Sequence, residues 1–262
     1  MLTFQADDDD RRPRVVVLEH HERVRLGALA STLEEHSRLR VLRGYADPAR
    51  GRLEIEELIA SGGYDGLIAL GSPVGVYDAD HLPYLQDSLR LMSDALRREA
   101  PVLGLCFGSQ MLAHLAGARV FPGSERGLAP EVGYFPLRVT EAGATDPVMT
   151  IFADPPPVLF WHRDTHDLPR DGVRLAATDL YATSAFRLGR WAYGLQFHLE
   201  TTADLMPVWV AQSPLPAEAG VDTHMILEEA ARFEVVVKER GARLATLFTT
   251  WAAEFARGSR RP

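Results

Sequence analysis

Residues 101–110, Pro101-Val-Leu-Gly-Leu-Cys-Phe-Gly-Ser-Gln110, decide the fold and contain the only cysteine of this 262-residue chain. An apolar run leads into Gly104-Leu-Cys106-Phe-Gly108, and a helical pattern begins at Gln110. This order predicts a buried strand, a sharp turn at Cys106 and then a helix. The two glycines indicate tight backbone packing around a strained residue, and the N-terminus of the helix favours thiolate over thiol. Cys106 is therefore a candidate covalent nucleophile.

A lone cysteine in an apolar stretch is more often a small core residue than a nucleophile. A second segment, Trp191-Ala-Tyr-Gly-Leu-Gln-Phe-His-Leu-Glu200, favours the catalytic interpretation. It has the pattern of a buried strand that ends in His198-Leu-Glu200, so the imidazole is expected where side chains emerge from a sheet. Glu200 can hold that imidazole if the chain turns. A cysteine, a histidine and a carboxylate together have the logic of a nucleophilic triad.

These two segments resemble the motifs of class I (triad-type) glutamine amidotransferases, Gly-[Ile/Leu]-Cys-x-Gly-x-Gln and His-Pro-Glu. More closely, the chain resembles stand-alone amidotransferases similar to the amidotransferase domain of GMP synthase. The resemblance runs from about Arg14 to about Trp209. Four further stretches carry it, namely Tyr64–Pro73, Glu131–Tyr134, Phe160–Pro169 and Ala182–Gly189.

The resemblance implies a role for particular residues of this chain. Cys106, His198 and Glu200 would be the catalytic triad. The oxyanion of the tetrahedral intermediate would be held by backbone N–H groups of Gly71, Ser72 and Phe107. Residues expected to shape the substrate pocket are Pro73, Gln110, His162 and Asp164; for His162, a packed or surface histidine is an equally good interpretation.

Three positions depart from the family pattern. Leu199 replaces the proline of His-Pro-Glu, so a rigid turn before Glu200 is lost. Ser72 replaces the second glycine of Gly-Gly-Pro, and its N–H can serve only if its backbone angles are compatible. Ser184 stands where the family often has glutamine. No triad group is missing, so we expect an enzyme; a non-catalytic flavodoxin-like binding module is the alternative that these departures support.

The alternation of predicted strands and helices indicates an α/β protein. We expect a flavodoxin-like three-layer αβα fold with a mostly parallel central sheet and a C-terminal helical extension. Early elements are a strand over 14–19, a helix over 21–38 and a strand over 41–45. The predicted organisation is a disordered lead-in over 1–13, an amidotransferase-like domain over 14–209, and a helical extension over 210–262 that packs on the domain.

Composition excludes several classes of function. The net charge of −8 argues against a general binder of nucleic acid or anionic membranes. A single cysteine allows no internal disulfide, and no segment has the length of a membrane span or a signal peptide core. The spacing of His, Asp and Glu matches no metal site, so we expect no metal or other cofactor and a cytoplasmic location.

The predicted reaction is hydrolysis of the side-chain amide of glutamine through a γ-glutamyl thioester on Cys106. Two enzymatic alternatives share this site. One is an amidotransferase subunit that passes ammonia to a partner synthetase. The other is a free-standing hydrolase of γ-glutamyl amides or peptides that needs no partner. They differ in whether the purified protein turns over alone, and on which amide.

Overall fold

The computed structural model describes residues 11–152 and 157–259. Within them, a sheet of eight strands has the order β2-β1-β3-β4-β12-β11-β10-β7. Its parallel part comprises β1 (Arg14–Leu18), β2 (Arg38–Leu42), β3 (Gly66–Ala69), β4 (Val102–Leu105) and β12 (Ala192–Leu195). The antiparallel part adds β11 (Ala185–Leu188), β10 (Gly172–Ala177) and β7 (Arg138–Val139).

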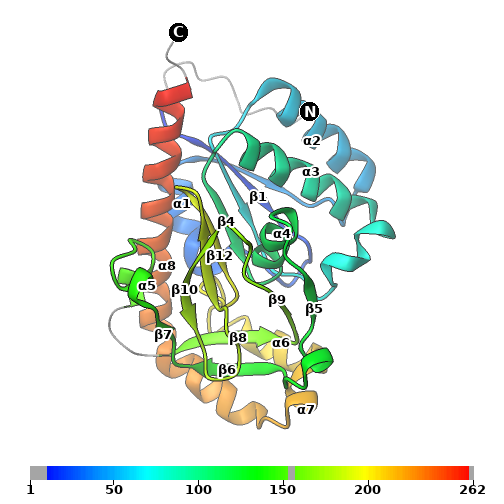
Figure 1. Cartoon of the computed structure of the whole chain (residues 1–262), viewed down its shortest axis with the longest axis vertical. Helices are drawn as coiled ribbons and strands as arrows, with labels where there is room; N and C mark the ends of the chain where they lie inside the picture. The colour runs from blue at the N-terminus through cyan, green and yellow to red at the C-terminus, as the bar shows by residue number, and fades with distance from the viewer. Residues whose placement is uncertain (1–10, 153–156, 260–262) are drawn as a thin grey trace.

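Alternate residues of the parallel strands face two different hydrophobic cores, as a strand period of two requires. Val15 and Val17 belong to the core that contains residues of α1 (Ala30–His36) and α8 (Thr223–Ser259). Val16 and Leu18 belong to the core shared with α2 (Pro48–Ser61), α3 (Pro83–Arg97) and α4 (Phe107–Leu115). The sheet is therefore covered on both faces (Figure 1), and the predicted three-layer αβα fold is confirmed.

Short strand pairs and short helices complete the fold. Two small antiparallel pairs lie outside the main sheet: β5 (Val120–Pro122) with β9 (Asp164–His166), and β6 (Glu131–Phe135) with β8 (Val158–His162). The short helices are η1 (Gly27–Leu29), η2 (Val76–Asp80), η3 (Gly123–Arg126), α5 (Glu141–Ala144), η4 (Met149–Phe152), α6 (Met206–Gln212) and α7 (Leu215–Ala219).

The predicted helix over 21–38 is wrong in its first part. Residues 21–26 form no helix; η1 begins at Gly27, α1 runs over Ala30–His36, and β2 begins at Arg38 instead of Val41. The cause is tertiary, because Gly27 has φ +44° and a Cβ at this position would lie 1.8 Å from the backbone oxygen of Glu200. The strand over 14–19 is confirmed as β1.

The C-terminal residues from 223 to 259 form one continuous helix, α8, which packs against η1, α1 and η4. The domain boundary at residue 209 stays a prediction. Of the lead-in over 1–13, residues 1–10 lie outside the described residues. No helix within the described ranges is long and apolar enough to cross a membrane.

Candidate active site

The elbow at Cys106 has the geometry that its glycines predict. Cys106 lies between β4 and α4 with φ +50° and ψ −105°, a conformation that is costly for a residue with a side chain. A Cβ on Gly104 would lie 2.3 Å from the backbone oxygen of Gly108, and one on Gly108 would lie 2.1 Å from the backbone oxygen of Ala69. Any side chain at either glycine would therefore displace the backbone that holds Cys106.

His198 reaches the same place from the neighbouring strand. β12 is parallel to β4 with Leu195 opposite Leu105, so the chain leaves both strands at the same edge of the sheet. The His198 backbone N–H then donates to Leu159 of β8 at 2.8 Å, which fixes where the imidazole begins. A Cβ on Gly71 would lie 3.3 Å from Cε1 of His198 and 3.8 Å from Cβ of Cys106. The imidazole, the thiol and the Gly71 turn are therefore immediate neighbours.

Glu200 is fully buried and holds the imidazole. Its Oε1 lies 2.6 Å from Nδ1 of His198, and its Oε2 accepts from the backbone N–H of Leu199 at 2.9 Å. Its backbone oxygen accepts from the N–H of Ala28 at 3.0 Å. The close approach of this backbone is possible only because Gly27 has no side chain. Both carboxylate oxygens are thus bonded, and the imidazole is fixed with its Nε2 facing away from Glu200.

The electrostatic environment favours a charged imidazole. Burial, the largest single cause, would lower the pKa of His198, but the charge and hydrogen-bond interactions with Glu200 and Cys106 together outweigh it and raise that pKa to about 10. Among the described residues, Nε2 of His198 has no hydrogen-bond partner that meets normal geometry. It is therefore available to move a proton to or from a group bound at Cys106.

Of the residues predicted to form the oxyanion hole, Gly71 and Ser72 share a cavity lining with Cys106, and Phe107 follows Cys106 in the chain. Ser72 follows the Gly71 turn and, with Gly71, lines the cavity at Cys106. Within residues 11–152 and 157–259, only Glu99 and Cys106 have positive φ among non-glycine residues, so Ser72 fits an ordinary backbone conformation. The ring of Phe107 is buried against His20, with centroids 5.1 Å apart. Phe107 can therefore act on a substrate only through its backbone N–H at the start of α4.

A cavity of about 160 Å³ opens above Cys106. Pro73, Gln110, His162 and Asp164, the predicted substrate-pocket residues, all line it. The ring nitrogens of His162 are already bonded, with Nδ1 3.0 Å from the backbone oxygen of Asp164 and Nε2 3.3 Å from Glu131. His162 is thus a packed residue of the cavity wall. Asp164 accepts from the hydroxyl of Tyr77 at 2.7 Å through Oδ2, whereas its buried Oδ1 has no partner among the described residues.

Sequence reasoning missed several residues of this site. The side-chain amide of Gln196 donates to Sγ of Cys106 at 3.6 Å and accepts from the amide of Gln110 at 3.4 Å. Gln196 lies two residues before His198, so the strand period could have placed it near the thiol. Trp161 and Trp209 also line the cavity, as do further residues that no local pattern indicates, namely His21, Arg23, Arg163, Gln212 and Leu215.

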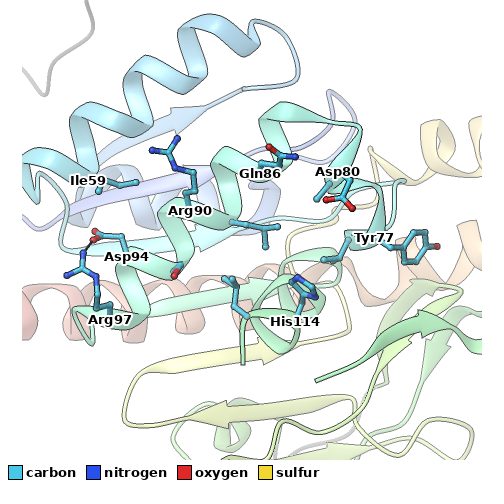
Figure 2. A pocket seen from close by; sticks show the side chains of 13 residues that line it. Ile59, Tyr77, Asp80, Gln86, Arg90, Asp94, Arg97 and His114 are labelled. Atoms are coloured by element: carbon cyan, nitrogen blue, oxygen red, sulfur yellow. Dashed lines mark hydrogen bonds and ion pairs between the residues drawn. The ribbon is translucent and has the colours of Figure 1, made fainter. Parts of the chain in front are cut away.

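A larger hollow of about 640 Å³ lies elsewhere, along α3 and the end of α4 (Figure 2). Its wall includes Tyr77, Arg90, Arg97 and His114, and Arg97 pairs with Asp94. It shares no residue with the cavity above Cys106. Cavity size therefore does not select a candidate reactive site, whereas the strained Cys106 and the neighbouring His198, which is bonded to Glu200, do. No group of three or more His, Cys, Asp and Glu residues in the described chain could hold a metal ion.

Comparison with known proteins shows the family and the fold. The family model described as glutamine amidotransferase class-I matches residues 39–209. The chain belongs to this family. A glutamine amidotransferase from Thermotoga maritima has a solved structure that is 30% identical, with a TM-score of 0.77 over 91% of this chain and 98% of that one. A glutamine amidotransferase from Methylobacillus flagellatus is 22% identical, with a TM-score of 0.73 over 91% of this chain and 94% of that one, and supports the fold.

Among curated relatives of this class-I amidotransferase, the glutamine-hydrolysing GMP synthase of Porphyromonas gingivalis is 33% identical over 140 residues, which are 53% of this chain and 25% of that protein. The glutamine amidotransferase-like protein YfeJ of Salmonella typhimurium is 29% identical over 54% of this chain and 59% of its own length. The match thus covers a quarter of the synthase and somewhat more than half of YfeJ.

Proposed function

We propose that this protein hydrolyses the side-chain amide of glutamine through a triad of Cys106, His198 and Glu200. The observation that carries the proposal is the buried His198, whose Nδ1 lies 2.6 Å from Glu200 while its Nε2 stays free beside the strained cysteine. Family membership supports the same chemistry.

In the first half of the reaction, the thiolate of Cys106 attacks the carbonyl carbon of the side-chain amide. The oxygen gains negative charge and is stabilised by backbone N–H groups of Phe107 and of the Gly71-Ser72 turn; one such donor typically contributes about 3–4 kcal/mol in the transition state. The protonated His198 gives its Nε2 proton to the amide nitrogen. The C–N bond breaks, ammonia leaves, and a γ-glutamyl thioester remains on Cys106.

In the second half, neutral His198 takes a proton from water, and the hydroxide attacks the thioester carbonyl. The C–S bond breaks, and glutamate and the thiolate are released with the imidazole protonated again. Glu200 stays ionised throughout and keeps the proton of Nδ1 in place. Every proton transfer uses Nε2 of His198, the ring nitrogen that is not bonded to Glu200.

The test measures glutamate and ammonia release from glutamine by the purified protein and by Cys106→Ala. Turnover that disappears in the variant would support the triad. Turnover that survives in Cys106→Ala would contradict it. Iodoacetamide gives a second readout that does not need turnover, since an activated Cys106 should react faster at pH 7 than a free thiol peptide.

That a partner synthetase accepts the ammonia is a separate proposal. The name of the GMP synthase relative joins glutamine hydrolysis to a synthase, which supports it. Steady turnover by the isolated protein would support a free-standing hydrolase. Turnover that rises only when a co-purified synthetase is added would support a partner-dependent subunit. The same two assays, run with and without the partner, separate these alternatives.

A further inference from the structure

The side of the cavity on which the leaving amine departs is fixed by His198. In the proposed reaction His198 protonates the leaving nitrogen, so that nitrogen and any substituent on it must lie next to the imidazole. The ring of Trp209 packs edge-on against the His198 ring, with centroids 4.9 Å apart. Trp209 in turn packs against Trp161 at 5.7 Å. The departing amine therefore meets an aromatic wall.

This wall offers no free hydrogen-bond donor from its indoles. Nε1 of Trp209 donates to the backbone oxygen of Arg23 at 2.9 Å, and Nε1 of Trp161 donates to Oγ of Ser213 at 3.2 Å. Both polar atoms are used within the protein, so each tryptophan presents only its apolar ring. Such a surface does not stabilise ammonia, which is small and polar. It would instead bury an alkyl or aryl group on the leaving amine.

The segment from α6 to α7 extends the apolar wall. Pro214 and Leu215 line the cavity directly after Ser213. Leu215 is half-buried, and its N–H is bonded to Oγ of Ser213 at 3.3 Å. On the side of Gly71 the wall continues with Val24, whose Cγ1 lies 3.4 Å from where a Gly71 Cβ would be.

Part of the polar lining, away from the two indoles' own partners Arg23 and Ser213, is linked by hydrogen bonds of its own. Gln110 donates to the backbone oxygen of Asp164 at 3.0 Å and contacts Gln196 at 3.4 Å. The buried Oδ1 of Asp164 has no partner within the described ranges. The cavity thus combines a polar set suited to the charged glutamyl moiety with an apolar set that borders His198.

We infer that the aromatic wall of Trp161, Trp209 and Leu215 is a leaving-group subsite, and that the preferred substrates are γ-glutamyl amides whose amine carries an apolar substituent. This inference rests on the proposed function and names its substrate class. Glutamine is then the smallest substrate and leaves the subsite empty. One methylene more or fewer in a hydrophobic pocket typically changes kcat/KM by about 10- to 200-fold.

The experiment compares kcat/KM for glutamine and for the γ-glutamyl methylamide, isobutylamide and benzylamide. We expect the isobutyl and benzyl compounds to exceed the methylamide by about tenfold or more. Leu215→Ala should reduce this ratio, and Leu215→Asp should favour the γ-glutamyl amide of 1,2-diaminoethane over the isobutylamide. Val208→Ala is the matched control, because Val208 lies on α6 with 39% of its surface exposed and does not line the cavity.

A second readout keeps the inference testable if turnover is slow. The same amides should protect Cys106 from iodoacetamide, with the benzylamide effective at about tenfold lower concentration than the methylamide. Equal protection and equal kcat/KM across the series would overturn the leaving-group subsite while glutamine turnover upholds the triad. Absence of turnover together with an unreactive Cys106 would overturn the proposed function and this inference with it.

Discussion

Replacing Glu200 by glutamine tests the bond that orients His198. The substitution keeps the shape of the side chain, and the amide oxygen can still accept from the N–H of Leu199. The amide NH₂ would then point at Nδ1 of His198, at the place of the present 2.6 Å contact. Nδ1 would have to become an acceptor, so the neutral ring would carry its proton on Nε2. An imidazole in that tautomer cannot take a proton from water.

The size of the effect follows from the pKa of His198, which its charged neighbours raise from 6.5 to about 10. The net rise of 3.5 pH units (10 minus 6.5) corresponds to about 5 kcal/mol, and because burial opposes it, the interactions with Glu200 and Cys106 together exceed this figure. Glu200 is the larger of these two causes. Losing about half of the total or more predicts a fall in kcat of about 10²- to 10³-fold.

The assay measures ammonia release from glutamine and, in parallel, alkylation of Cys106 by iodoacetamide at pH 7. Glu200→Gln should slow both. Glu254→Gln is the matched control, since this exposed carboxylate pairs with Arg190 at 2.7 Å on the surface and should leave both rates unchanged. A folded Glu200→Gln protein that turned over within threefold of wild type would refute the role assigned to Glu200.

Three further predictions concern the elbow, the thiol and a buried histidine. Gly108→Ala should lower stability by about 3 kcal/mol or more, because its Cβ would lie 2.1 Å from the backbone oxygen of Ala69; a melting temperature equal to that of wild type would contradict this. Gln196→Leu removes the 3.6 Å donor to the sulfur of Cys106 and should slow alkylation about tenfold and move its pH profile upward; an unchanged profile would exclude this role. Burial lowers the pKa of His20 to about 4. The unfolded chain binds a proton below pH 6.5 that the folded protein binds only near pH 4, so His20 alone should lower stability by about 3 kcal/mol from pH 6.5 to 4 (2.5 pH units). Urea denaturation should show a loss of stability over this range that is smaller in His20→Gln by about that amount.

The elements that could be predicted from sequence are those fixed by local chemistry. The elbow is one of them. A side chain at Gly104 or Gly108 would collide with neighbouring backbone atoms, and this is the steric reason why glycines flank Cys106. The apolar runs that became β1, β3 and β4 are others. Their order in the sheet, with β12 beside β4, depends on contacts between residues far apart in the chain.

The parts that could not be predicted depend on tertiary contacts. The helix predicted from residue 21 begins late because Gly27 must approach the backbone of Glu200, which lies far along the chain. The consequence reaches the site, because the non-helical segment places His21 and Arg23 at the cavity. Trp209 could not be assigned either, since only the packing of α6 brings its ring onto His198.

Leu199 shows how a departure from a family motif can be compatible with its chemistry. The family has proline at this position, and a proline ring fixes the turn that presents the glutamate. Proline has no N–H, however, whereas the N–H of Leu199 donates to Oε2 of Glu200 at 2.9 Å. The leucine side chain is itself buried, with 1% of its surface exposed, which anchors the turn by packing. A hydrogen bond and a buried side chain thus do here what ring rigidity does elsewhere, and the second carboxylate oxygen gains a partner that a proline could not provide.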